Sequence, residues 1–196
     1  MAEAKKLGGA GLRGQTAGQT ALCTVGKEGT GLTYRGYDVR DLAENVRFEE
    51  VAYLLLYGEL PTQAQLDAYL QKLKSRRGLP QPLKEVLERI PKSAHPMDVM
   101  RTGCSVLGTL EPEEDFSQQQ DVADRLLAVF PSIITYWYRY SHDGVRIDTE
   151  TDDDSIGAHF LRCLHGKEPS ELHAKVMNTS LILYAEHEFN ASTFTA

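Results

Sequence analysis

The sequence predicts an all-α, multihelical domain with a short β-hairpin near its N-terminus. From residue 38 onward, apolar residues recur at helical spacing between recognisable start and stop signals. Strand character is confined to residues 21–39, where apolar residues lie on both sides of a glycine-rich turn. Residues 1–20 are rich in glycine and alanine and lack a periodic apolar pattern. We therefore expect a disordered tail followed by one domain over residues 21–196.

The hairpin is predicted from two short stretches that flank three glycines. Leu22 and Thr24 precede the turn, and Leu32 and Tyr34 follow it. The glycines between them are Gly26, Gly29 and Gly31. A nucleotide-binding loop is the alternative, but the GxGxxG order is absent and no helix opens directly after the glycines. A turn is therefore the favoured interpretation.

Each predicted helix is bounded by capping or breaking residues. Spacing and breakers place helices at residues 39–46, 48–57, 63–77, 82–90, 96–108, 121–140, 151–165 and 170–188. Thr62 and Gln65 have the spacing of a capping box, as do Ser117 and Gln120. Pro131 lies inside the longest of these helices and is expected to kink it.

The composition argues against several classes of protein. The net charge of −7 disfavours non-specific attraction to nucleic acid or to an anionic membrane. No apolar stretch is long enough to span a bilayer, and the N-terminus lacks the apolar core of a signal peptide. Cys23, Cys104 and Cys163 lack the paired spacing of a zinc site. We expect a cytoplasmic protein with reduced, buried thiols, no bound metal, and no nucleic-acid or membrane partner.

The last predicted helix carries the most informative histidine. At 100° per residue, His187 continues a stripe whose other members are Leu172, Val176, Thr179 and Leu183. If the helix continues for another turn, Asn190 joins the same face. An imidazole beside a carboxamide donor can form a socket for a carbonyl or carboxylate group. The alternative is a core histidine hydrogen-bonded to a backbone carbonyl, which these residues alone favour because most buried polar groups are satisfied in this way.

Two further clusters have a structural explanation that is simpler than a chemical one. His159 and Cys163 are four residues apart and therefore adjacent on a helix. With no visible third group to orient them, an inert buried thiol is favoured. Asp152, Asp153 and Asp154 lack the alternation of a calcium loop, so we expect a solvated helix start that the helix dipole favours.

A basic cluster and an aromatic cluster each leave two interpretations open. The basic residues lie at the end of a predicted helix, where cations complement the carbonyl ends, but they could also contact an anionic ligand. They are Lys72, Lys74, Arg76 and Arg77. The aromatic residues occupy more than one face of their helix and fit either a bundle centre or a subunit contact. They are Tyr136, Trp137, Tyr138 and Tyr140.

Four segments of the chain form a specific signal when they occur in this order. They are LTYRGYDVRDLAENVRFEEVAYLLLYGELP, HPMDVMRTG, TDDDSIGAHFLRCLHG and LYAEHEFNASTFTA. Together they resemble the citrate synthase family, and the resemblance covers most of the chain from Ala21 to Ala196. The segments YWYRYSHDG and ETDDDSIG are more similar to the methylcitrate synthases of that family than to its housekeeping citrate synthases.

The resemblance implies an all-α, homodimeric, cytoplasmic enzyme. Members condense an acyl-CoA, here propionyl-CoA, with oxaloacetate. A base removes the α-proton of the thioester, the enol attacks the ketone carbon, and water then releases free CoA. Both reactants are substrates, so no cofactor is implied. The positions that match the family's oxaloacetate pocket are His187 and Asn190, and His187 is expected to polarise the oxaloacetate carbonyl.

The chain also departs from the pattern of the family. The sequence contains no counterpart of several later features of the family. These are the HGGAN-type and GFGH-type loops, the catalytic aspartate and the small domain that closes over CoA. We therefore expect the N-terminal part of the large helical domain, with the catalytic residues beyond Ala196, no synthase activity in isolation, and exposed apolar surface on helices that would meet the remainder. Two alternatives stay open: a citrate synthase that uses acetyl-CoA, and a non-catalytic helical protein that dimerises or binds a carboxylate.

Overall fold

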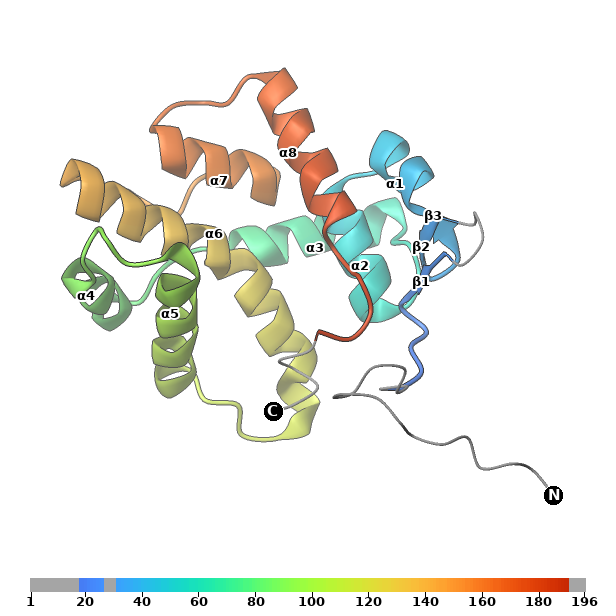
Figure 1. Ribbon diagram of the computed structural model, residues 1–196, viewed down its shortest axis with the longest axis horizontal. Coiled ribbons are helices and arrows are strands. Elements are labelled where there is room, and N and C mark those ends of the chain that lie inside the picture. The colour runs from blue at the N-terminus through green and yellow to red at the C-terminus, as the bar shows by residue number, and fades with distance from the viewer. Residues whose placement is uncertain (1–17, 27–30, 191–196) are drawn as a thin grey trace, which may run out of the picture.

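The computed structural model describes residues 18–26 and 31–190, which form a helical domain with a small sheet at one edge (Figure 1). The described ranges contain eight α-helices, one 3-10 turn and three short strands. The predicted all-α class with an N-terminal hairpin is therefore confirmed. The predicted tail lies almost entirely in residues 1–17, which fall outside the described residues.

The sheet contains the predicted hairpin and one strand that was not predicted. Strands β1 (Cys23–Val25) and β2 (Leu32–Tyr34) pair antiparallel, with Cys23 opposite Tyr34. Strand β3 (Tyr37–Asp38) adds to β2 after a two-residue turn in which Gly36 has a φ of +91°. A two-residue strand carries too little periodicity to be seen in the sequence.

Four helices follow the sheet and begin and end close to the predicted residues. They are α1 (Val39–Asn45), α2 (Phe48–Tyr57), α3 (Gln63–Lys74) and α4 (Gln81–Arg89). Gly58 ends α2 in the left-handed conformation, and Thr62 and Gln65 form the predicted capping box of α3. Helix α3 ends three residues earlier than predicted, at Lys74, and Ser75 is its C-cap.

Helix α6 (Gln119–Asp143) runs through the middle of the molecule and packs against α3, α4, α5 (Pro96–Leu110) and α7 (Ile156–His165). The predicted capping box at Ser117 and Gln120 is wrong, because Asp115 caps a 3-10 turn at Phe116–Gln118 that leads directly into α6. Pro131 remains inside a continuous helix, and the axis of α6 changes direction midway along its length (Figure 1).

The last two helices are α7 (Ile156–His165) and α8 (Glu171–Leu183). Helix α8 ends five residues before the predicted end at residue 188, with Tyr184 at its C-cap. Its predicted apolar stripe is not buried, since Leu172 is 68% exposed and Val176 is 59% exposed. The stripe prediction was therefore wrong for the described residues, whereas the expected exposure of apolar helix surface is found here.

Two hydrophobic clusters stabilise the fold. The first lies mainly between the sheet, α1, α2, α3 and α8, and its fully buried members are Tyr34, Val51, Leu54 and Ile182. The second lies between α4, α5 and α6, and includes Leu83, Leu87, Val99, Ile133, Tyr136 and Trp137. The aromatic cluster thus contributes two core residues, while Tyr138 is exposed. Within the described residues, no helix is long and apolar enough to cross a membrane.

Candidate functional site

His187 lies on the segment that follows α8, which we call the His187 segment and define as residues 184–190 (Figure 1). The segment is not helical, and both His187 and Asn190 are exposed. The prediction that they share one face of a continued helix is wrong, because α8 ends at Leu183. The alternative of a core histidine is wrong as well, since the side chain of His187 is outside the core.

Side chains of the N-terminal sheet hold the His187 segment. The Tyr34 hydroxyl donates to the carbonyl of Ile182, at 2.9 Å, and accepts the backbone N–H of Glu186, at 3.4 Å. The Cys23 thiol accepts the backbone N–H of Glu188, at 3.2 Å, and lies 3.5 Å from Oε1 of Glu186. The residues on both sides of His187 are therefore fixed to β1 and β2.

The two sheet side chains are buried and uncharged. Tyr34 is fully buried and Cys23 is 6% exposed. Burial raises the pKa of the Tyr34 hydroxyl and the pKa of the Cys23 thiol, so both groups keep their protons at neutral pH. Glu188 has a φ of +64°, an uncommon value for a residue with a side chain, so the backbone turns sharply just after His187.

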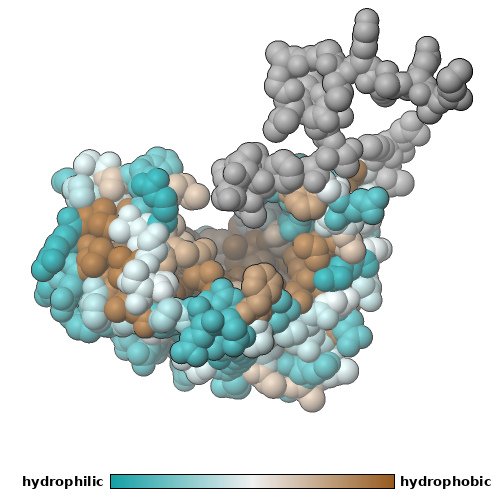
Figure 2. Space-filling model, turned by 90° about the horizontal axis from the view of Figure 1, so that it is seen from below, coloured by the Kyte–Doolittle hydropathy of each residue, from teal (hydrophilic) through white to brown (hydrophobic). Residues whose placement is uncertain are grey.

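An apolar groove with a volume of about 400 Å³ lies beside the segment. Its walls are formed by α2 and α6, and Ala185 and Glu186 of the His187 segment also line it. The main lining side chains are Phe48, Leu55, Leu56, Leu126, Leu127 and Phe130. Figure 2 shows a hollow lined by hydrophobic residues on the face seen from below.

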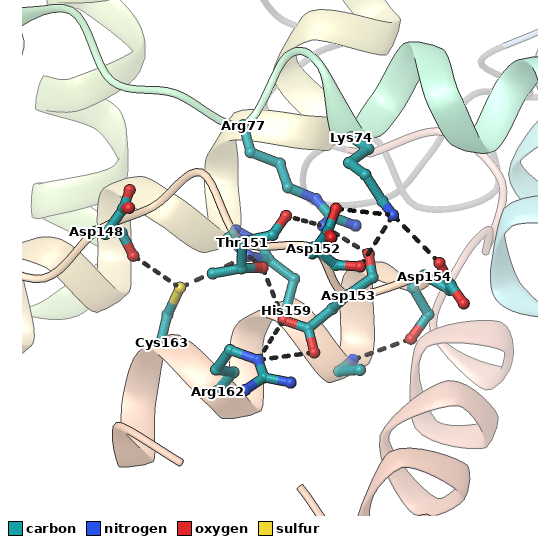
Figure 3. Close-up of polar contacts among 12 residues, drawn as sticks. Lys74, Arg77, Asp148, Thr151, Asp152, Asp153, Asp154, His159, Arg162 and Cys163 are labelled. Carbon is teal, nitrogen blue, oxygen red and sulfur yellow. Dashed lines mark hydrogen bonds and ion pairs between the residues drawn. The ribbon is translucent and has the colours of Figure 1, made fainter. Parts of the chain in front are cut away.

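A second polar cluster surrounds the other informative histidine, His159, on α7 (Figure 3). Its Nε2 lies 2.9 Å from Oγ of Ser132, and its Nδ1 lies 2.9 Å from Oγ1 of Thr151. Because the Thr151 hydroxyl donates to Asp153, it accepts from His159, which places the imidazole proton on Nδ1. Nε2 then accepts the proton of the Ser132 hydroxyl.

The Cys–His pair in this cluster is buried and uncharged at neutral pH. His159 is fully buried, and this burial, with the nearby Arg77 cation, lowers its pKa to about 4. Burial raises the pKa of Cys163 to about 11, so the thiol stays protonated although its sulfur lies 3.6 Å from Nδ1 of His159. The predicted burial of the Cys163 thiol is therefore confirmed, and Ser132 and Thr151 are partners of His159 that the sequence did not reveal.

The acidic run belongs to a loop before α7. Ser155 caps α7, and Asp153 is only 8% exposed because it accepts hydrogen bonds from Thr151 and from Nε of Arg162, the latter at 2.8 Å (Figure 3). The prediction of a solvated helix start is therefore wrong for Asp153. Among the described residues, no group of three His, Cys, Asp or Glu side chains could hold a metal ion.

The basic cluster is used within the chain. Arg77 is 2% exposed and donates to the carbonyls of Thr151 and Asp153. Lys74 pairs with Asp152 and Asp154. The other two cations are likewise paired, Lys72 with Asp121 and Asp124 and Arg76 with Asp121. Because all four cations have partners within the chain, these ion pairs and hydrogen bonds argue against the alternative that the basic cluster binds an anionic ligand.

Comparison with known proteins gives the family. A family model described as citrate synthase, C-terminal domain, matches residues 11–196. The chain belongs to the citrate synthase family. It is 79% identical over 196 residues to the 2-methylcitrate synthase of Shewanella oneidensis, covering 100% of this chain and 52% of that relative. It is 39% identical over 189 residues to the citrate synthase of Mycolicibacterium smegmatis, covering 95% and 50%.

Solved citrate synthases share the fold of this chain. The crystal structure of the Thermotoga maritima enzyme has a TM-score of 0.80 at 30% identity, covering 94% of this chain and 48% of that one. A ternary complex of the Thermoplasma acidophilum enzyme with carboxymethyl coenzyme A and oxaloacetate has a TM-score of 0.84 at 26% identity, covering 93% and 48%. The chain thus spans about half the length of the relatives it matches.

Proposed function

We propose that this chain is the N-terminal part of the large helical domain of a 2-methylcitrate synthase. The observation that carries the proposal is the 79% identity to the Shewanella oneidensis enzyme, maintained over all 196 residues. The proposed reaction condenses propionyl-CoA with oxaloacetate and water to give 2-methylcitrate and CoA. Both reactants are substrates, and the reaction calls on no resident cofactor.

Within this reaction we assign oxaloacetate binding to His187 and Asn190. Both residues are exposed on a segment whose neighbouring backbone is fixed, which suits side chains that must meet a small ligand in a defined place. An imidazole N–H can donate to the ketone oxygen of oxaloacetate and stabilise the negative charge that grows there as the enol attacks. The Asn190 carboxamide can donate to a carboxylate oxygen. The proton-abstracting residues are expected outside residues 1–196.

The assembled enzyme is proposed to be a cytoplasmic homodimer. The exposed apolar side chains of α8 support further packing, because stretches of apolar surface on a folded domain commonly mark contacts. Acetyl-CoA is the second candidate acyl donor, since two relatives, at 39% and 34% identity, are named citrate synthases. Propionyl-CoA and acetyl-CoA differ by one methylene, and an apolar pocket discriminates between such substrates by only about 1–3 kcal/mol.

A chimera tests the proposal directly. Residues 1–196 would be joined to the remaining part of Shewanella oneidensis 2-methylcitrate synthase, whose matching half is 79% identical. The proposal expects oxaloacetate-dependent release of CoA, with a higher kcat/KM for propionyl-CoA than for acetyl-CoA. Residues 1–196 alone are expected to be inactive. A folded chimera without activity contradicts the proposed function, and a preference for acetyl-CoA supports the second candidate.

A further inference from the structure

The N-terminal sheet contacts the His187 segment on both sides of His187 and leaves the imidazole exposed. Tyr34 reaches the residue before it and Cys23 the residue after it. These contacts join positions that are more than 150 residues apart in the sequence. Short loops of this kind have many accessible conformations unless other elements hold them, so these contacts define where the imidazole points.

Tyr34 makes hydrogen bonds both to the end of α8 and to the His187 segment. Its hydroxyl donates to the carbonyl of Ile182, in the last turn of α8, and also lies 3.4 Å from the carbonyl of Leu183. The same oxygen accepts the N–H of Glu186. One fully buried hydroxyl thus satisfies the end of the helix and starts the segment that follows it. A phenylalanine ring would fill the same space without either hydrogen bond.

Cys23 and Gly18 hold the far side of His187. The Cys23 sulfur accepts the N–H of Glu188, the residue with the uncommon φ of +64°. The ring of Phe189 packs so closely on Gly18 that an added Cβ there would lie 3.0 Å from its Cζ atom. Contacts from Tyr34, Cys23 and Gly18 therefore reach residues on both sides of His187.

We propose that Tyr34 and Cys23 are positioning residues, which hold the imidazole of His187 in the orientation that oxaloacetate requires. The inference rests on the proposed function of His187 and extends it to two side chains of the sheet. Neither residue contacts the ligand in this account. Each acts through the backbone of Glu186 or Glu188, so a change at Tyr34 or Cys23 alters the affinity for oxaloacetate and leaves the affinity for the acyl-CoA unchanged.

The experiment uses Tyr34→Phe and Cys23→Ala in the chimera defined above. Loss of a net stabilisation of about one hydrogen bond should raise the KM for oxaloacetate about three- to tenfold for Tyr34→Phe, with the KM for propionyl-CoA unchanged. Cys23→Ala should have a smaller effect in the same direction. Cys23→Ser keeps an acceptor for the N–H of Glu188, so it should bind oxaloacetate more tightly than Cys23→Ala.

Matched controls come from the other parts of the fold. Tyr136 is a second buried tyrosine, whose hydroxyl donates to Glu88, and Cys163 is a second buried free cysteine. Tyr136→Phe and Cys163→Ala remove the same atoms in other parts of the fold, so the KM for oxaloacetate should remain within twofold of the parent. These controls separate positioning of His187 from a general loss of stability.

Histidine side-chain NMR on the folded chimera gives a readout that does not depend on catalysis. His187→Ala identifies the His187 resonance in the spectrum of the chimera. Tyr34→Phe and Cys23→Ala should shift or broaden this resonance, whereas Tyr136→Phe should leave it in place. An unchanged resonance and an unchanged KM for oxaloacetate in both sheet variants would overturn the inference. If His187→Ala itself leaves oxaloacetate binding intact, the proposed function fails, while the NMR result still decides whether the sheet positions the imidazole.

Discussion

His159 and His187 occupy contrasting regions of the same chain. His159 is fully buried on α7, and both of its ring nitrogens are within 2.9 Å of hydroxyl groups. His187 is exposed, and Tyr34 and Cys23 bind the backbone N–H groups of Glu186 and Glu188 on either side of it. The ring nitrogens of His159 are therefore used within the fold, whereas at His187 the described hydrogen bonds hold the neighbouring backbone and the side chain is exposed, as the proposed binding role requires.

The largest expected effect on stability is at the buried histidine. His159→Ala removes the partner of Ser132 and Thr151 and leaves a cavity, so we expect the free energy of unfolding to fall by about 3 kcal/mol. The exposed His173→Ala is the matched control, with an expected change within about 0.5 kcal/mol. Urea unfolding of the three proteins measures both values. If His159→Ala were as stable as the parent, His159 would not be the structural histidine that the contrast with His187 requires.

Acid should weaken the His159 region in a defined pH window. The pKa of His159 is about 4 in the folded chain and near 6.5 in an exposed histidine, so the unfolded chain takes up the proton first. The contribution of His159 is complete above pH 6.5 and falls by up to about 3 kcal/mol as the pH drops to 4. His159→Gln should lack this part of the pH dependence, and His173→Gln should retain it. Parallel unfolding curves for parent and His159→Gln across this window would contradict the assignment.

A smaller effect of opposite sign is expected at Glu49, on α2. Glu49 is 1% exposed, and only one of its carboxylate oxygens has a hydrogen bond, from the N–H of Ile156 at 2.7 Å. Burial raises its pKa, so its contribution to stability decreases as the pH rises from about 4.5 through the pKa of the folded state.

Glu49→Gln removes the ionisable carboxyl group while keeping an acceptor for the N–H of Ile156. The substitution should raise the free energy of unfolding by about 1 kcal/mol at pH 8 and by less at pH 4.5, where the native carboxyl is protonated. Unfolding curves at the two pH values measure the difference. A destabilised variant at pH 8 would show that the ionised carboxylate is stabilised by groups other than the N–H of Ile156.

Local signals in the sequence predicted most of the helices and the hairpin. Thr62 with Gln65 and Gly58 act on neighbouring residues, and their effects were predicted correctly. Ser117 had the right spacing for a cap, but Asp115 takes that role two residues earlier. The end of α8 was missed because it depends on Tyr34, which is remote in sequence and donates to the carbonyl of Ile182.

The candidate site was predicted only in part for the same reason. The resemblance identified His187 and Asn190, but helical periodicity placed them on a buried face that the structure does not contain. The contacts of Tyr34 and Cys23 join positions more than 150 residues apart, and no local pattern encodes them. Likewise, Asp153 is buried in the loop before α7 and accepts a hydrogen bond from Arg162, nine residues later. The sequence shows only a run of acids, which is typical of a solvated segment.

His187 is proposed to bind oxaloacetate, and His187→Ala in the chimera tests this role most directly. Removal of one electrostatic donor at a developing oxyanion lowers the rate by about 100- to 1,000-fold, so kcat/KM for oxaloacetate should fall at least about 100-fold. Because the side chain is exposed, the free energy of unfolding should change by no more than about 0.5 kcal/mol. A folded variant that keeps its kcat/KM for oxaloacetate within threefold of the parent would contradict the account.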